Sequence, residues 1–247
     1  DPDPLRAINR KFFCIFPSMK TIIITGANGN LGVATVKKFL DNNYRVIGIA
    51  RSGSNLGFAT GHKYFELHQL DLTDENAVIS FIKEAISLYG SIEGALFLAG
   101  GFAMGNLAGT HSSDFYKMLS LNFETAYHAT RVLFEHMVKK GYGRLIFIGA
   151  KTALHPENAS GALAYALSKS LLFNLAGILN ATAKGKNVTA SVIVPSIIDT
   201  EANRKDMPDA DWNKWVKPEQ IADVMEFVCS EKGLALREPI LKVYNNL

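Results

Sequence analysis

The amino-acid sequence predicts an α/β fold in which helices cover both faces of a doubly wound, parallel sheet of seven strands. From residue 19 onwards, short runs rich in β-branched residues alternate with longer segments that carry apolar residues at helical spacing, which is the pattern of βαβ units. The runs TIIIT (21–25) and ASVIV (190–194) are almost continuously apolar, as strands buried on both faces should be. A chain of 247 residues that is 48% hydrophobic can bury one sizeable core, so we expect a single domain over residues 19–247.

Seven short runs account for the expected strands, and helical segments separate them. Helical spacing follows the first strand at Val36, Phe39 and Leu40. The segments 112–139 and 162–183 are long and apolar on more than one face, as helices at a twofold interface are, and they predict self-association. The expected strands are residues 21–25, 45–50, 63–70, 94–99, 144–149, 189–194 and 239–244.

Composition narrows the function classes. The 26 basic and 23 acidic residues are scattered, without a basic stripe that would follow a phosphate backbone, so we expect no nucleic-acid partner. No signal peptide or long apolar span is visible, and Cys14 and Cys229 lie in no disulfide or metal spacing. These features predict a cytoplasmic protein with neither a membrane partner nor a metal site. Residues 1–18 precede a natural-looking start at Met19, and we expect them to be an added leader or a genuine extension, disordered or packed on a partner.

The first expected strand runs directly into TGANGNLG (25–32), which predicts a dinucleotide site of the Rossmann type. Glycines at a strand-to-helix junction let the backbone turn tightly and approach a pyrophosphate, and the helix that follows offers N–H donors at its N-terminus. Glycines can also mark a simple turn, but their position after the first strand favours a nucleotide. The residues expected to contact it are Gly26, Asn28, Gly29, Asn30, Leu31 and Gly32.

The ends of the second and third strands predict the rest of the adenosine site. The second strand ends in Ala50-Arg51-Ser52, where an NAD site would carry Asp or Glu for the ribose hydroxyls. Arg51 offers a guanidinium fork to a 2′-phosphate and Ser52 a second donor, so NADP(H) is favoured over NAD(H); the alternative is a surface arginine at a strand end. Asp71, with its neighbour Leu72, either orients the adenine or caps the helix that begins at Asp74.

A tyrosine and a lysine form the expected catalytic pair. Tyr165 and Lys169 stand four residues apart in an apolar helical segment, so their side chains lie on one face. An ammonium there favours tyrosinate, and we expect it to draw the phenol pKa below its usual value near 10, so that proton exchange becomes practicable near neutral pH. The alternative is a buried tyrosine beside a snorkelling lysine on an interface helix.

In this order, the motifs resemble the short-chain dehydrogenase/reductase family over nearly all of residues 19–247. The match comprises TGANGNLG, the catalytic pair in YALSK, Asn122 in LSLNFETAY and PSIIDT (195–200). The resemblance implies an NAD(P)H-dependent oxidoreductase that forms dimers or tetramers, and it implies a water-linked proton relay between Asn122 and Lys169. The further cofactor contacts that it implies are Ala99, Gly100, Gly101, Tyr165, Lys169, Pro195, Ile198 and Thr200.

One departure from the family pattern concerns the substrate. The fifth strand leads into Ala150-Lys151-Thr152, where the family usually presents a serine that hydrogen-bonds the substrate carbonyl. Ala150 cannot do this, so either Thr152 serves instead, or the substrate needs no such donor, or the site is inactive. The dihydropteridine reductase subgroup also lacks the serine, and this chain resembles it in AGG (99–101), GAK (149–151) and residues 198–215. That subgroup prefers NADH through an acidic residue at the second strand, where this chain has Arg51.

The leading hypothesis is hydride transfer from NADPH to a small carbonyl or a quinonoid, imine-like substrate, with Tyr165 giving the proton and Lys169 tuning it. The segment 201–217 is expected to cover the substrate, with Trp212 and Trp215 either stacking on a planar ring or anchoring the loop. Two alternatives stay open. One is a 3-oxoacyl or carbonyl reductase that uses Thr152, and the other is a binding protein that senses NADP(H) without catalysis.

Overall fold

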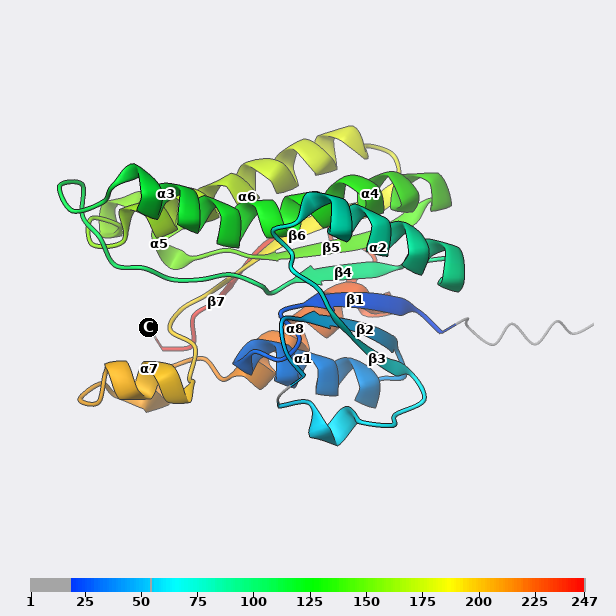
Figure 1. The fold of residues 1–247 in the computed structure, drawn as a ribbon, viewed down its shortest axis with the longest axis horizontal. Coiled ribbons are helices and arrows are strands. Elements are labelled where there is room, and N and C mark those ends of the chain that lie inside the picture. The colour runs from blue at the N-terminus through cyan, green and yellow to red at the C-terminus, as the bar shows by residue number, and fades with distance from the viewer. Residues whose placement is uncertain (1–18, 54, 247) are drawn as a thin grey trace, which may run out of the picture.

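A parallel sheet of seven strands forms the centre of the molecule in the computed structural model, which describes residues 19–53 and 55–246 (Figure 1). The strands lie in the order β3-β2-β1-β4-β5-β6-β7, and each neighbouring pair is parallel. This confirms the expected doubly wound fold, because the order reverses between β1 and β4. The strands are β1 Thr21–Thr25, β2 Arg45–Ala50, β3 Phe65–Gln69, β4 Gly94–Phe97, β5 Tyr142–Ile148, β6 Asn187–Pro195 and β7 Ile240–Val243.

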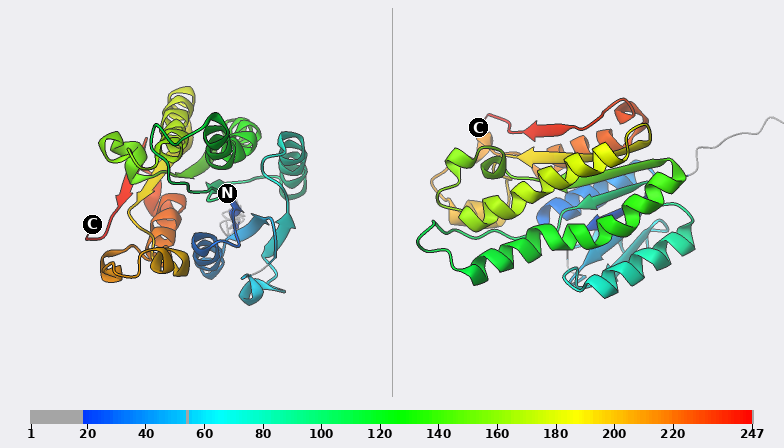
Figure 2. Two further views of the ribbon diagram at one scale, coloured as in Figure 1. Left: turned by 60° about the vertical axis from the view of Figure 1, so that its left-hand side comes forward. Right: turned by 90° about the horizontal axis from the view of Figure 1, so that it is seen from above.

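Helices cover both faces of this sheet. One face carries α2, α4 and α6 together with α3 and α5, and the other carries α1 packed against α8 (Figures 1 and 2). In the described part of the chain, no helix is both long and apolar enough to cross a membrane. The helices are α1 Asn30–Asp41, α2 Glu75–Tyr89, α3 Ser112–Leu119, α4 Thr125–Lys140, α5 Lys151–Leu154, α6 Leu163–Thr182, α7 Glu201–Asp206 and α8 Pro218–Cys229, and a π-helical turn, Ser120–Glu124, joins α3 to α4.

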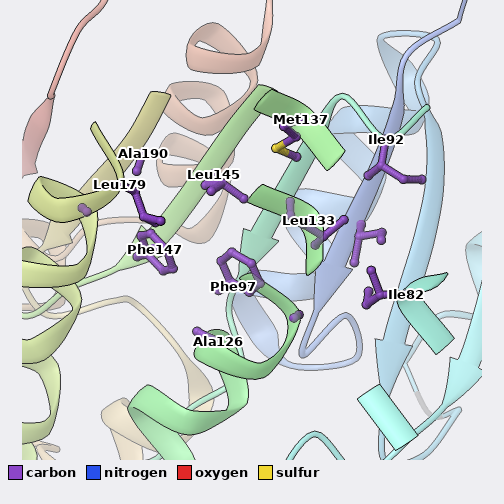
Figure 3. Packing of buried hydrophobic residues seen from close by; sticks show 14 of the residues in the cluster. Ile82, Ile92, Phe97, Ala126, Leu133, Met137, Leu145, Phe147, Leu179 and Ala190 are labelled. Carbon is purple, nitrogen blue, oxygen red and sulfur yellow. The ribbon is translucent and has the colours of Figure 1, made fainter. Parts of the chain in front are cut away.

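The two faces of the sheet bury separate apolar clusters because side chains alternate along a strand. Ile23 joins the cluster beneath α2, α4 and α6, whereas its neighbours Ile22 and Ile24 join the cluster beneath α1 and α8. Figure 3 shows the first cluster, where the rings of Phe97 and Phe147 stack with centroids 5.0 Å apart. Packing on both faces holds the strand ends in fixed positions, and the candidate site is built at those ends.

Some strand boundaries differ from the expected ones. β5 begins at Tyr142 rather than at residue 144, and β6 begins at Asn187 rather than at 189. The reason is the ladder between them, because Tyr142 pairs with Asn187 and extends both strands beyond their apolar runs. The expectations for residues 1–18 lie outside the described residues.

Candidate active site

The glycine loop between β1 and α1 has the backbone conformation that its sequence requires. Gly26 adopts a φ of +65°, and a Cβ there would lie 2.9 Å from the backbone nitrogen of Ala99. Gly29 is the N-cap of α1, and the first turn of that helix has neither a side-chain cap nor an acidic residue. The backbone N–H groups of this turn, including those of Asn30 and Leu31, are therefore placed to receive an anion.

This loop opens into a cavity of about 450 Å³ at the carboxyl edge of the sheet. The cavity lies where β1 and β4 are neighbours, which is where nucleotides bind in open α/β sheets. Eight of the residues predicted to bind the cofactor line it: Gly26, Asn28, Gly29, Arg51, Asp71, Leu72, Ala99 and Gly100. Residues far apart in the sequence thus share one wall, as the prediction requires.

Arg51 and Asp71 both line this cavity, and the charge of Arg51 acts on the Asp71 carboxylate. Hydrogen bonds from the backbone and the hydroxyl of Thr73 lower the pKa of Asp71, and the charge of Arg51 lowers it further. The proposed alternative that Asp71 caps the next helix is wrong, because Asp74 caps α2 by accepting a hydrogen bond from the Ala77 amide. Ser52 does not line the cavity, but its hydroxyl accepts a hydrogen bond from Asn28 Nδ2 at 2.9 Å.

Of the predicted catalytic pair, Lys169 lies beside the same cavity, and Tyr165 lies against the segment that leaves β4. Lys169 is buried, and its Nζ donates to the Ile148 carbonyl at the end of β5, at 2.8 Å. A Cβ on Gly100, which lines the cavity, would lie 3.4 Å from that Nζ. Tyr165 stands one turn earlier on α6, and its ring packs edge-on against Phe102 with centroids 4.9 Å apart. The segment that leaves β4 therefore connects the cavity to the phenol.

The expected lowering of the Tyr165 pKa is wrong for this structure. Burial raises the pKa of Tyr165 to about 12, and burial lowers the pKa of Lys169 to about 8. The Lys169 ammonium donates a hydrogen bond to the Ile148 carbonyl rather than to the phenol. The cost of desolvating the tyrosinate therefore outweighs the attraction between tyrosinate and ammonium. At neutral pH the pair consists of a neutral phenol and a protonated amine.

Asn122 is almost completely buried within the π-helical turn, at 1% exposure, and its side chain is fully engaged. Its Oδ1 accepts from the Gly101 amide at 2.9 Å, and its Nδ2 donates to Ser168 Oγ at 3.1 Å. A π-helical turn commonly marks a functional position in a helix. The amide ties the segment after β4 to α6 beside Lys169, which is the neighbourhood that the relay prediction requires.

The run from β6 into α7 holds the remaining predicted cofactor contacts. Pro195 ends β6, and Thr200 caps α7 by accepting from the Asn203 amide. Asn203 Nδ2 donates to the Ile198 carbonyl at 2.8 Å, so one residue, Asn203, holds Thr200 through its backbone amide and Ile198 through its side chain. These three predicted contacts lie outside the lining of the cavity, as does Gly101.

The two tryptophans of the segment 201–217 have different surroundings. Trp215 is buried and anchors the loop, which is the second of the two roles proposed for it. Trp212 is partly exposed, and its Nε1 donates to the Met207 carbonyl at 3.1 Å.

The start of α5 carries the departure from the family pattern. Ala150 is buried at the N-cap of α5, and it offers no hydroxyl there. The hydroxyl of Thr152 is buried and has no hydrogen-bond partner among the residues that the structure describes.

Comparison with known sequences decides the family. A sequence profile described as short chain dehydrogenase matches residues 20–211, which include the glycine loop, the cavity and the catalytic pair. The chain belongs to the short-chain dehydrogenase family. It is therefore an oxidoreductase that depends on NAD(P)H.

Individual known proteins are similar to this chain at modest sequence identity. The 3-oxoacyl-acyl-carrier-protein reductase FabG of Buchnera aphidicola (strain Sg) is 25% identical over 87% of this chain and 91% of its own. A dihydropteridine reductase of Dictyostelium discoideum is 27% identical over 83% and 85%. A solved structure titled "ElxO with NADP Bound" superposes with a TM-score of 0.81 at 22% identity, covering 91% of this chain and 97% of that one. At that identity the superposition shows the fold alone.

Sequence reasoning missed several residues of this short-chain dehydrogenase site. Leu70 and Thr73 adjoin predicted residues, so the carboxyl-edge rule could have found them. Leu121, which adjoins the predicted Asn122, and Thr125 come from the π-helical turn and the start of α4, and no motif in the sequence places that stretch against the cavity. Ser168 and Phe102 owe their places to contacts that only folding creates.

Proposed function

We propose that this short-chain dehydrogenase transfers hydride from NADPH to a small carbonyl or a quinonoid, imine-like substrate, with Tyr165 as the proton donor. The observation that carries the proposal is the position of the catalytic pair, since Lys169 Nζ lies next to the Gly100 wall of the nucleotide cavity. A pair on an interface helix, away from any cavity, would have supported only a structural role.

The lining of the cavity supports binding of the adenosine and phosphate parts of a phosphorylated dinucleotide. The uncapped first turn of α1 would hold the pyrophosphate, Asp71 and Leu72 the adenine, and Arg51 a 2′-phosphate. Tyr165, Lys169, Ile198 and Thr200 would hold the nicotinamide end. When bound, the cofactor supplies the hydride, and the protein supplies orientation and the proton.

The proton chemistry follows from burial. Because burial raises the pKa of Tyr165 to about 12, the phenol keeps its proton at neutral pH and can donate it to a developing oxygen or nitrogen anion. The protonated Lys169 lies one helical turn away and stabilises the phenolate that remains. Asn122 holds the Gly101 segment against α6 and so fixes the wall beside Lys169.

Ala150 favours a substrate that needs no serine donor, such as a conjugated C=N system of the quinonoid pterin type. The similarity to a dihydropteridine reductase agrees with this choice. The absence of an acidic residue at the end of β2 argues for NADPH rather than NADH.

A test follows NADPH absorbance with quinonoid dihydropterin, simple ketones, a 3-oxoacyl thioester and quinones. Tyr165→Phe should lower kcat/KM at least about 100-fold, because it removes the hydroxyl that donates the proton. It should leave NADPH affinity within about twofold, because the ring keeps its shape and nearly all of its volume. Tyr116→Phe, at an exposed tyrosine of α3, is the matched control and should change neither quantity. Binding of NADPH without turnover of any substrate would support a sensor instead.

Cofactor choice is tested at Arg51. Arg51→Ala should weaken NADPH binding by about tenfold or more, since it removes a charge-assisted contact to the 2′-phosphate, while NADH binding stays unchanged. Arg237→Ala, at the opposite end of the sheet, controls for the loss of one positive charge. Preference of the unchanged protein for NADH would contradict the role of Arg51.

A second candidate is a 3-oxoacyl or carbonyl reductase in which Thr152 replaces the serine. The observation that favours it is the buried Thr152 hydroxyl, for which the described residues offer no hydrogen-bond partner, together with the similarity to FabG. Thr152→Ala should then abolish reduction of ketones and thioesters. An unchanged rate with those substrates would remove this candidate.

The proposal includes a homodimer or homotetramer in the cytoplasm. Exposed apolar side chains on α4 and α6 support self-association. The thiol of Cys229 is buried, and burial raises its pKa to about 12, so it is suited to a reducing compartment rather than to disulfide exchange.

A further inference from the structure

In the segment between β6 and α8, one side chain, Arg204, contacts both Asp199 near the start and Trp212 further along. Its guanidinium donates two hydrogen bonds to the Asp199 carboxylate, from Nε to Oδ1 at 2.6 Å and from Nη2 to Oδ2 at 2.7 Å. The same guanidinium lies over the ring of Trp212, with 4.7 Å from its central carbon to the ring centroid. One arginine thus joins the exit of β6 to the far side of the covering loop.

Asp199 is the critical partner because of where it lies. It stands between Ile198 and Thr200, the two residues proposed to hold the nicotinamide end, and its side chain is only 12% exposed. Hydrogen bonds from Arg204 lower the pKa of Asp199, and the charges of Arg204 and Lys217 lower it further. Without Arg204, a poorly hydrated carboxylate would lose its two strongest hydrogen bonds, and the residues on both sides of it would have to shift.

Asn203 and backbone hydrogen bonds also hold this segment, but none of the hydrogen bonds described for it other than those of Arg204 reaches the Asp199 carboxylate. The Asp199 amide donates to the Val216 carbonyl at 2.8 Å, and the Val216 amide donates to the Ile197 carbonyl at 2.9 Å, so a short β-bridge holds the backbone on both sides of Ile198. Trp212 is tied to its own loop through the Met207 carbonyl and contacts the buried Trp215, with centroids 6.4 Å apart. Arg204 therefore adds a side-chain link, from the Asp199 carboxylate to the Trp212 ring, to a segment whose backbone is already bridged. Figure 1 shows α7, which carries Arg204, near the C-terminal end of the chain.

We infer that Arg204 is a positioning residue, which holds Ile198 and Thr200 in the conformation that receives the nicotinamide end of the cofactor. The inference rests on the proposed function. It requires the planar, bidentate and stacking guanidinium rather than a positive charge as such, because only arginine can grip a carboxylate and lie flat on an indole at once.

The experiment compares two ligands of the purified full chain by calorimetry, NADPH and adenosine 2′,5′-bisphosphate. The second ligand carries the adenosine and the 2′-phosphate but no nicotinamide. Arg204→Ala should weaken NADPH binding by about fivefold, because the competent conformation is less populated, and should leave binding of the fragment unchanged. Arg204→Lys should resemble Arg204→Ala, while Lys205→Ala, a neighbouring exposed cation of α7, should resemble the unchanged protein.

The outcomes separate the inference from the function on which it rests. If both ligands weaken equally, Arg204 acts through general stability, and if neither weakens, it positions nothing; either result overturns the inference. Recovery of NADPH affinity in Arg204→Lys would also overturn it. Failure of the unchanged chain to bind NADPH would instead overturn the proposed function, and the inference with it.

Discussion

At the catalytic pair, burial rather than mutual attraction sets the protonation states. Lys169 is buried beneath the segment after β4 with one carbonyl as its hydrogen-bond partner, and the phenol of Tyr165 is shielded by Phe102. Desolvation disfavours both charged forms, so it raises the pKa of the acid and lowers that of the base. The site therefore stores a proton on Tyr165 and holds an amine that titrates close to physiological pH.

The Lys169 shift predicts a pH dependence of stability. Its pKa is about 8 in the folded chain and 10.5 in the unfolded one, so between these values the unfolded chain binds more protons and stability rises with pH. Relative to Lys169→Met, the unchanged protein should gain on the order of 2 kcal/mol in free energy of unfolding between pH 7.5 and 9.5. Urea unfolding of both proteins at the two pH values measures the gain, and the difference removes contributions from Cys229 and the tyrosines. Parallel changes in the two proteins would show that Lys169 is not perturbed.

At the scale of elements, the junction of β1 and α1 leaves no room for side chains. A Cβ on Gly32 would overlap the Gly26 carbonyl oxygen and would lie 2.7 Å from the Ala27 carbonyl oxygen. The helix therefore begins close against the turn, and its N–H groups face the cavity rather than a side chain.

Gly32→Ala should destabilise the protein by about 3 kcal/mol, because backbone cannot move aside for a methyl group as a flexible side chain can. Gly177 offers the matched control, since it also lies inside a helix but meets no atom within 4 Å. Gly177→Ala should change stability by less than about 1 kcal/mol, and in the stabilising direction. Chemical denaturation measures both changes, and equal effects would contradict the close packing at Gly32.

The π-helical turn shows how an element can escape prediction. Residues 112–139 have the periodicity of one long helix, but the structure divides them into α3, the turn and α4. The turn contains Asn122, whose side chain bonds both the Gly101 amide and Ser168, and both partners lie on other elements.

At the scale of the whole molecule, the layer of α2, α4 and α6 presents apolar side chains to solvent. Ile178 is 63% exposed and Leu167 46% exposed on α6, and Tyr127 is 38% exposed on α4. Scattered apolar residues are normal on a surface, but the sequence of both helices already predicted an interface.

Ile178→Glu should shift the protein toward smaller species in sedimentation velocity without changing its circular dichroism, because an interface would bury the new charge without a partner. Lys232→Glu, in the exposed turn after α8, controls for a change of surface charge. A monomeric unchanged protein at high micromolar concentration would contradict the predicted oligomer.

The amino-acid sequence was sufficient for the sheet, the glycine loop and the spacing of Tyr165 and Lys169. Those features depend on local periodicity, on the conformational freedom of glycine and on the pitch of a helix, which act over a few neighbouring residues. Burial reversed the expected effect on the phenol, and long-range contacts formed the link from Asp199 through Arg204 to Trp212. Desolvation and such contacts depend on which distant segments pack together, and the residues next to Tyr165 or Asp199 in the sequence do not determine that packing.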